Sequence, residues 1–267
     1  MGEHFGIYRR LVGARIRSRF QYRLSFALEA LGTASVTFLD FVAILILFEQ
    51  VDALGDWSVA EVGVLYGISS VAYSLTDLAI GQIGVLPRMI REGDFDLVLL
   101  RPLGSLFQVI ASDFALRRLG RFAQGLAVLV VAAASLDLEW SLARVGMLIV
   151  AVVAGAVIFA GIWIGLATVA FWLIDSMDVV TAFTGGGAFL AQYPVNIFGR
   201  WLRRLVVFVI PVSFVSYFPA LYVLGKDDLL GLPSALQFVS PLVAVATCVA
   251  GGLLWRAAVR HYRSVGA

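Results

Sequence analysis

"VGMLIVAVVAGAVIFAGIWIGLATVAFWL" (residues 145–173) continues for 29 residues without a charged side chain. An α-helix rises about 1.5 Å per residue, so about 20 apolar residues cross the roughly 30 Å of hydrocarbon in a bilayer. Comparable apolar blocks recur along the chain, which is 61% hydrophobic and only 14% charged. Soluble domains carry about 25% charged residues. The sequence therefore predicts an all-α integral membrane protein.

Six transmembrane spans are predicted, at residues 26–48, 59–85, 122–136, 145–173, 205–224 and 236–255. The first apolar run is too long for the core of a cleavable signal peptide, so we interpret it as a permanent span. The expected organisation is an amphipathic interface helix at 1–24, one six-helix permease domain at 25–258 and a basic tail at 259–267.

Basic residues predict the orientation of these spans. Of the 20 Lys and Arg residues, all but Arg144 and Lys226 fall on one side of the predicted topology. Cytoplasmic loops are enriched in Lys and Arg. We therefore expect both termini to be cytoplasmic, in a multi-pass protein of the cell inner (plasma) membrane. The same count argues against a seventh span at 178–199, since a further crossing would spoil the asymmetry. We interpret 178–199 as a helical segment at the cytoplasmic interface.

The N-terminal segment combines a regular apolar stripe with many arginines. Apolar residues recur every four positions, at Tyr8, Val12, Ile16, Phe20 and Leu24. Such a helix lies along the membrane surface, with its cations near anionic headgroups. The residues predicted to contact the membrane interface are Arg9, Arg10, Arg15, Arg17, Arg19 and Phe20. The alternative is a segment that serves only to orient the chain.

The connection between the second and third spans contains "REGDFDLVLLRPLGS" (residues 91–105). Gly93 can end the incoming helix, Asp94 is a suitable N-cap, and Pro102 permits a break soon afterwards. Phe95, Val98 and Leu99 then share one helical face. The pattern predicts a short helix with an exposed apolar face. Its uses would be docking of a cytoplasmic partner or packing on the membrane surface, and the alternative is a plain connecting loop.

Two motifs resemble a known family. "IREGDFDLVLLRPLGSLFQ" (90–108) resembles the signature loop of the permeases of type-2 ABC exporters, the ABC-2 superfamily, and "FVIPVSFVSYFPALYVLG" (208–225) resembles the fifth span of the same family. The resemblance implies that the loop at 87–104 holds a coupling helix, seated in a groove of a separate ATPase subunit. The coupling residues that it implies are Arg91, Gly93, Asp94, Phe95, Asp96, Leu99, Arg101 and Pro102.

The same resemblance implies a complex. Family members are half-transporters that join a second permease, a related but different chain or a second copy, over two ATPase subunits. Exporters of this superfamily also insert short re-entrant helices between spans five and six. Here that connection is brief, so such helices must borrow from 217–224 or be vestigial.

ATP and Mg²⁺ are expected on the partner ATPase, and this chain by itself is not expected to be an enzyme. A nucleotide-binding loop requires Gly-x-x-x-x-Gly-Lys-Ser/Thr, but the only lysine, Lys226, precedes Asp227. No bound cofactor, catalytic site, metal site or nucleic-acid partner is predicted. His4 and His261 lie at opposite ends of the sequence, and Cys248 is the single cysteine.

Two acidic residues, Asp40 and Asp77, lie inside predicted spans. A charged side chain at the centre of a transmembrane helix costs about 2.5–3.5 kcal/mol on insertion scales, so it usually faces a cavity or a partner. Both are candidates for the translocation path, and the alternative is that each accepts local hydrogen bonds. They also support a second hypothesis, an ion- or proton-coupled secondary transporter. The chain lacks the inverted repeat and the broken-helix pairs that are typical of such carriers.

Overall fold

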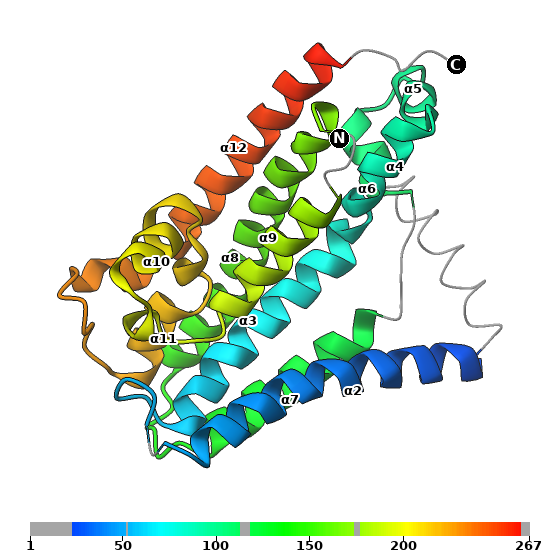
Figure 1. Ribbon diagram of the computed structural model, residues 1–267. Helices are drawn as coiled ribbons and strands as arrows, with labels where there is room; N and C mark the ends of the chain where they lie inside the picture. Colours follow the sequence, from blue (N-terminus) through cyan, green and yellow to red (C-terminus); the bar gives the residue numbers. More distant parts are fainter. Residues whose placement is uncertain (1–22, 52, 113–117, 174–176, 263–267) are drawn as a thin grey trace.

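The computed structural model describes residues 23–51, 53–112, 118–173 and 177–262, and every regular element in these ranges is helical. This confirms the predicted all-α class. The longer helices are α2 (Arg23–Phe48), α3 (Val59–Ile80), α7 (Leu119–Ala134), α8 (Leu142–Ala167), α9 (Met177–Leu190) and α12 (Ser240–His261). Helices α3, α8, α9 and α12 follow a common direction, and α2 with α7 lies to one side of them (Figure 1).

Short elements gather at the two ends of this bundle. One end, called here the α5 end, holds η2 (Gly81–Val85), α4 (Leu86–Arg91), α5 (Asp94–Leu99), α6 (Ser105–Ile110) and η4 (Thr168–Phe171). The other, called the α11 end, holds η5 (Val195–Ile197), α10 (Arg200–Arg204), η6 (Leu205–Val209), η7 (Val212–Phe214), α11 (Tyr217–Leu224) and η8 (Ser234–Phe238).

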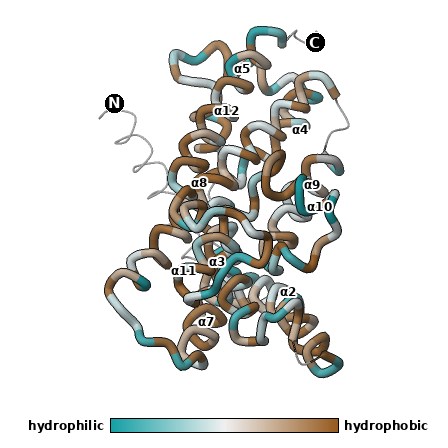
Figure 2. Tube along the Cα trace, turned by 90° about the vertical axis from the view of Figure 1, so that its left-hand side faces the viewer, coloured by the Kyte–Doolittle hydropathy of each residue, from teal (hydrophilic) through white to brown (hydrophobic). Residues whose placement is uncertain are grey.

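Helix length and composition fit a multi-pass membrane protein. In the described ranges, the helices long and apolar enough to cross a bilayer are Ala27–Phe48, Val59–Arg91, Leu142–Phe171 and Ser240–His261. Helices α7 and α9 are apolar but shorter. Hydrophobic residues follow most of α8 and α12, and hydrophilic ones surround α5 (Figure 2). The count of six spans, the cytoplasmic placement of the termini and the interface helix at 1–24 stay predictions; residues 1–22 lie outside the described ranges.

The predicted fifth span at 205–224 is not a single helix. Its two parts, Arg200–Val209 and Val212–Leu224, meet at an angle of 71°. Pro211 lies at the break, where its missing amide hydrogen cannot continue a helical hydrogen-bond pattern. The predicted span at 205–224 is therefore broken at Pro211, and whether its two parts cross the membrane as one span stays a prediction.

The segment 178–199, predicted at the cytoplasmic interface, packs along the bundle, and its position relative to the membrane stays a prediction. Helix α9 begins after η4 at the α5 end and runs beside α3 and α8 toward the α11 end (Figure 1). The hydroxyl of Ser69, in the middle of α3, donates to the carbonyl of Ala188 at 3.2 Å, and the hydroxyl of Ser216 donates to the carbonyl of Ala191. The segment thus passes along the bundle.

This passage moves the arginines that follow α9. The amide of Asn196 donates to the carbonyl of Gly55 at 2.7 Å, and the guanidinium of Arg203 donates to the carbonyl of Asn196 at 2.9 Å. Lys226 donates to the neighbouring Asp56 carbonyl at 2.7 Å. Arg203, with Arg200 and Arg204 in the same short helix, therefore lies at the end of the bundle that holds Lys226. The basic residues are therefore distributed less unevenly between the two ends of the bundle than the sequence count indicated.

Close helix contacts occur where glycine replaces a side chain. At the crossing of α8 and α12, a β-carbon on Gly251 would lie 2.5 Å from the carbonyl oxygen of Gly161. Between α3 and α7, a β-carbon on Gly67 would lie 2.6 Å from that of Leu129. In lipid, helices associate through such small-residue contacts, because burial from water no longer drives them together.

We expect Gly251→Ala to destabilise the α8–α12 crossing, because the added methyl group has no room. Overpacking typically costs about 1–3 kcal/mol, which exceeds the gain of about 1 kcal/mol from replacing glycine in a helix. The matched control is Gly252→Ala, whose new β-carbon meets nothing within 4 Å and should leave stability unchanged or raised. Thermal unfolding of the detergent-solubilised protein measures both, and equal midpoints for the two variants would refute the steric argument.

Candidate functional site

The short helix predicted after Gly93 is present. Gly93 separates α4 from α5 with φ 78°, a left-handed backbone conformation that glycine adopts without a steric penalty. Gly93 itself occupies the N-cap position, and Asp94, predicted as the N-cap, is the first helical residue. Helix α5 ends at Leu99, and the turn containing Pro102 follows.

The ring of Phe95 holds this helix against the rest of the bundle. It is 0% exposed and meets the rings of Phe171, Trp255 and Tyr262 edge to face, with centroids 5.2, 6.5 and 5.1 Å away. Buried aromatic pairs in this geometry contribute about 0.5–1.5 kcal/mol each beyond the area that they bury. The cluster joins α5 to the ends of α8 and α12.

Hydrogen bonds hold the rest of the loop to the same cluster. The side-chain amide of Gln108 donates to the carbonyls of Val98 and Leu103, at 2.9 and 2.7 Å. The indole of Trp255 donates to the hydroxyl of Ser105 at 3.1 Å. The α4–α5–α6 segment is therefore fixed to α12 by polar as well as aromatic contacts.

The predicted exposed face of α5 is partly wrong. Phe95 and Val98 point into the bundle, and of the three predicted residues only Leu99 is exposed. The apolar residues that are most exposed here are Leu97 and Leu100, at 57% and 81%. The periodicity of the sequence correctly paired Phe95 with Val98 but could not show that the rings of Phe171, Trp255 and Tyr262 would cover Phe95.

The remaining predicted coupling residues surround this outward face. Arg91, at the end of α4, is exposed, as is Pro102. Asp94 and Arg101 are exposed and line a hollow of about 440 Å³, whose floor includes Val98 and Gln108.

Asp96 has a different surrounding from its neighbours in α5. Its carboxylate lies near Tyr262 beyond the end of α12, and burial together with this charge raises the pKa of Tyr262 to about 12.

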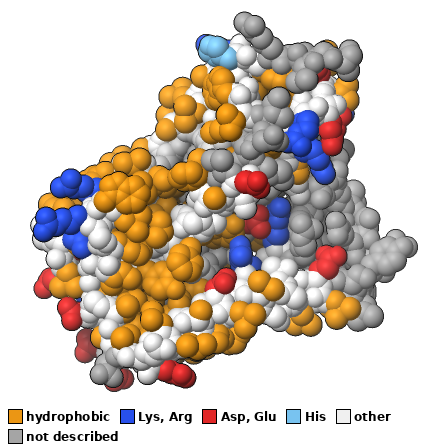
Figure 3. Space-filling view, in the orientation of Figure 1, with side chains coloured by type: hydrophobic (Ala, Val, Ile, Leu, Met, Phe, Trp, Pro, Cys, Tyr) orange, Lys and Arg blue, Asp and Glu red, His pale blue; other side chains and the backbone are white. Residues whose placement is uncertain are grey.

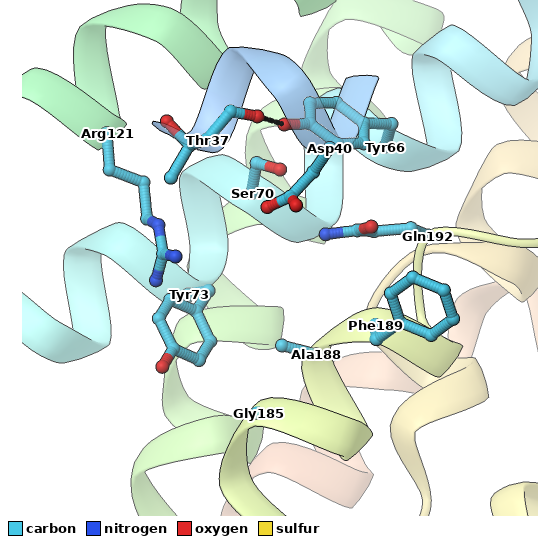
Figure 4. Close-up of a pocket in the computed structure, with 10 residues that line it drawn as sticks. All are labelled: Thr37, Asp40, Tyr66, Ser70, Tyr73, Arg121, Gly185, Ala188, Phe189 and Gln192. Carbon is cyan, nitrogen blue, oxygen red and sulfur yellow. Dashed lines mark hydrogen bonds between the residues drawn. The ribbon is translucent and has the colours of Figure 1, made fainter. Parts of the chain in front are cut away.

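A polar cavity of about 130 Å³ lies between α2, α3, α7 and α9. Its walls include Asp40, Tyr66, Tyr73, Arg121 and Gln192, together with Thr37, Ser70, Gly185, Ala188 and Phe189 (Figure 4). Acidic and basic side chains are visible in the middle of an otherwise largely apolar face (Figure 3). Of the two predicted intramembrane acids, Asp40 thus reaches a cavity.

The wall of this cavity is ordered by contacts between its own residues. The hydroxyl of Tyr66 donates to the carbonyl of Thr37 at 2.7 Å, and the amide of Gln124 donates to the same hydroxyl at 3.2 Å. The guanidinium of Arg121 lies 4.8 Å from the centre of the Tyr73 ring, within the range of a cation–π interaction.

Asp77 has a different environment. Its carboxylate lies 3.1 Å from the guanidinium of Arg118, which also donates to the Asp77 carbonyl at 2.7 Å. Both side chains are largely buried, so this pair ties the end of α3 to the start of α7. Asp77 does not line the cavity around Asp40.

Sequence reasoning missed several residues of these sites. Arg118 and Arg121 were counted only as loop charges, and Tyr262 only as part of the tail. Arg118 lies one helical turn before Arg121, a spacing that puts both on one face of α7 and could have marked them. The predicted membrane-interface residues Arg9, Arg10, Arg15, Arg17, Arg19 and Phe20 lie outside the described ranges.

These features define a multi-pass membrane protein with a polar cavity among its helices and a short helix packed across one end of the bundle. Residues 34–266 match the family model described as ABC-2 family transporter protein. The chain therefore belongs to this family and is an ABC-2 type transmembrane permease. Comparisons with curated proteins and with solved structures gave no significant match.

We expect Phe95→Ala to loosen α5 without unfolding the bundle. Removing a buried phenylalanine ring costs about 3–5 kcal/mol, and local opening of a short helix is governed by such contacts. Hydrogen exchange of peptides covering residues 94–103 should accelerate roughly 100-fold. The matched control is Leu97→Ala, which removes an exposed side chain of the same helix and should change exchange little. Unchanged protection in Phe95→Ala would contradict the anchoring role.

Proposed function

We propose that this chain is one permease half of an ATP-driven exporter, and that α5 is the helix through which a separate ATPase subunit moves it. The observation that carries the proposal is the position of α5. The helix lies across one end of the bundle, with its inner face fixed to α8 and α12 and with Leu97 and Leu100 exposed.

The outer surface of α5 suits a protein partner. It combines exposed leucines with the oppositely charged Asp94 and Arg101 at the rim of a hollow. Interfaces of this kind place apolar anchors at the centre and polar groups at the edge. The partner would be one of two ATPase subunits, each holding ATP and Mg²⁺, and a second permease, a related chain or a second copy, would complete the pathway.

The topology that we propose has six crossings, with α9 in place of 205–224 as the fifth. The two helical parts that meet at Pro211 then form a re-entrant hairpin at the α11 end. This hairpin includes residues 217–224, the segment from which the sequence analysis expected such helices to be drawn. In this arrangement both termini and α5 face the cytoplasm of a cell whose inner (plasma) membrane holds the protein. The described basic residues near α5, among them Arg88, Arg91, Arg101, Arg256 and Arg260, support this orientation.

The alternative function, an ion- or proton-coupled carrier, depends on Asp40 and Asp77. The ion pair between Asp77 and Arg118 weakens that hypothesis, because it gives the Asp77 carboxylate a partner within the chain itself. Coupling through α5 accounts for more of the observed geometry.

We expect Leu100→Asp to reduce the amount of ATPase subunit that co-purifies with the chain by tenfold or more. A charge at the centre of an apolar contact is desolvated without a partner, at a cost of several kcal/mol. The experiment co-expresses the chain with the ABC ATPase subunits of the same cell, and purifies the complex from detergent by an affinity tag on the chain.

The matched control is Leu142→Asp, which introduces the same charge at a leucine that is 90% exposed at the start of α8, near the α11 end. This variant should retain the ATPase. Equal recovery of ATPase with both variants would exclude α5 as the contact, and equal loss would show that the effect is not specific to α5.

A further inference from the structure

The cavity between α2, α3, α7 and α9 contains opposite charges that do not meet. Asp40 of α2 and Arg121 of α7 both line it, and Figure 4 shows their side chains directed into it from different sides. Within the described part of the chain, no hydrogen bond or ion pair reaches the Asp40 carboxylate. Arg121 instead lies over the Tyr73 ring.

A charged group in the apolar part of a bilayer needs a partner, because its insertion costs about 2.5–3.5 kcal/mol. The pair Asp77–Arg118 shows that α3 and α7 can bring opposite charges into contact at 3.1 Å. At Asp40 and Arg121 the protein keeps the two charges apart across a polar space. A ligand that carries both charges would satisfy both residues at once.

We propose that this cavity binds a small zwitterionic headgroup, with its ammonium toward Asp40 and its anionic group toward Arg121. Tyr66 adds an aromatic ring to the lining, and such rings attract an ammonium group, whereas the face of Tyr73 is already covered by Arg121. Ser70 and Gln192 add neutral polar groups to the lining. This inference rests on the proposed function only in placing the cavity on a transport path.

The size of the cavity favours a headgroup over a whole amphiphile. It holds about 130 Å³, whereas sites for drug-sized molecules occupy about 300–1,000 Å³. The ring of Phe189 borders the cavity and is 52% exposed. An apolar tail attached to the bound headgroup would therefore leave the cavity beside Phe189.

The test is a calorimetric titration of the nucleotide-free chain, purified in detergent with its co-purifying subunits. The probes are dihexanoyl-phosphatidylethanolamine, which is zwitterionic, and dihexanoyl-phosphatidylglycerol, which carries only the negative charge. We expect the zwitterionic lipid to bind at least tenfold more tightly. Asp40→Asn should weaken the binding of phosphatidylethanolamine about tenfold or more, because a hydrogen bond to a charged group contributes about 1.5–3 kcal/mol. The affinity for phosphatidylglycerol should not change. Arg121→Gln should weaken the binding of both lipids.

The matched control is Glu29→Gln, which removes an exposed carboxylate from α2 away from the cavity and should change neither affinity. Equal binding of the two lipids by the unaltered chain, or full affinity for phosphatidylethanolamine in Asp40→Asn, would overturn the proposal. If Asp40→Asn does not fold, as judged by thermal unfolding, the loss expected for Arg121→Gln decides in its place.

A third probe separates the two sources of this chemistry. Soluble phosphoethanolamine that competes with the lipid indicates a site for free zwitterions, and binding of the lipid alone indicates a membrane-derived ligand. Leu100→Asp should keep the headgroup affinity even when the ATPase is lost, so failure of coupling and failure of this site give different results.

Discussion

The contact between Gly161 and Gly251 is the constraint on which the α5 end depends. Burial from water gives no drive for association inside lipid, so backbones must approach closely to gain packing energy. The crossing allows α12 to lie against α8, because any β-carbon at Gly251 would strike the Gly161 carbonyl. This register brings Trp255 beside Phe171 at 5.7 Å, and these two rings form much of the surface on which Phe95 lies.

Aromatic rings pack together at both ends of the bundle, around Phe95 at the α5 end and around Tyr217 at the α11 end. The α11 end adds contacts between charged and polar groups. At the α11 end, Lys226 pairs with Glu61 at 2.7 Å and lies 4.8 Å from the centre of the Trp57 ring, and the hydroxyl of Tyr217 donates to Asp228 at 2.8 Å. Polar groups that are mostly withdrawn from water need such partners, since each unpaired one costs about 1–3 kcal/mol. The bent pair around Pro211 is thereby tied to the loop before α3.

The sequence predicted much of this fold because its strongest signals are local. Long apolar runs placed α2, α3, α8 and α12, and Gly93 correctly marked the start of α5. The errors arose where the answer depends on distant partners. Residues 178–199 are apolar enough to lie either along the bundle or across one end of it. Only their contacts with α3 and α8 show that they lie along the bundle. The orientation of Phe95 likewise depends on rings that lie about 160 residues later in the chain.

The cavity lies at the boundary between parts of the bundle that are joined in different ways. Helices α8 and α12 are in backbone contact, and Phe95 packs against rings at the ends of both. Helix α2 meets α3 through contacts that include the Tyr66 hydrogen bond to Thr37 and the ring of Phe41, 5.1 Å from that of Tyr66. Tyr66 lines the cavity and also takes part in this contact between α2 and α3. Displacement of α3 with α8 relative to α2 would therefore change the distance between Asp40 on α2 and the groups of α3 that face it.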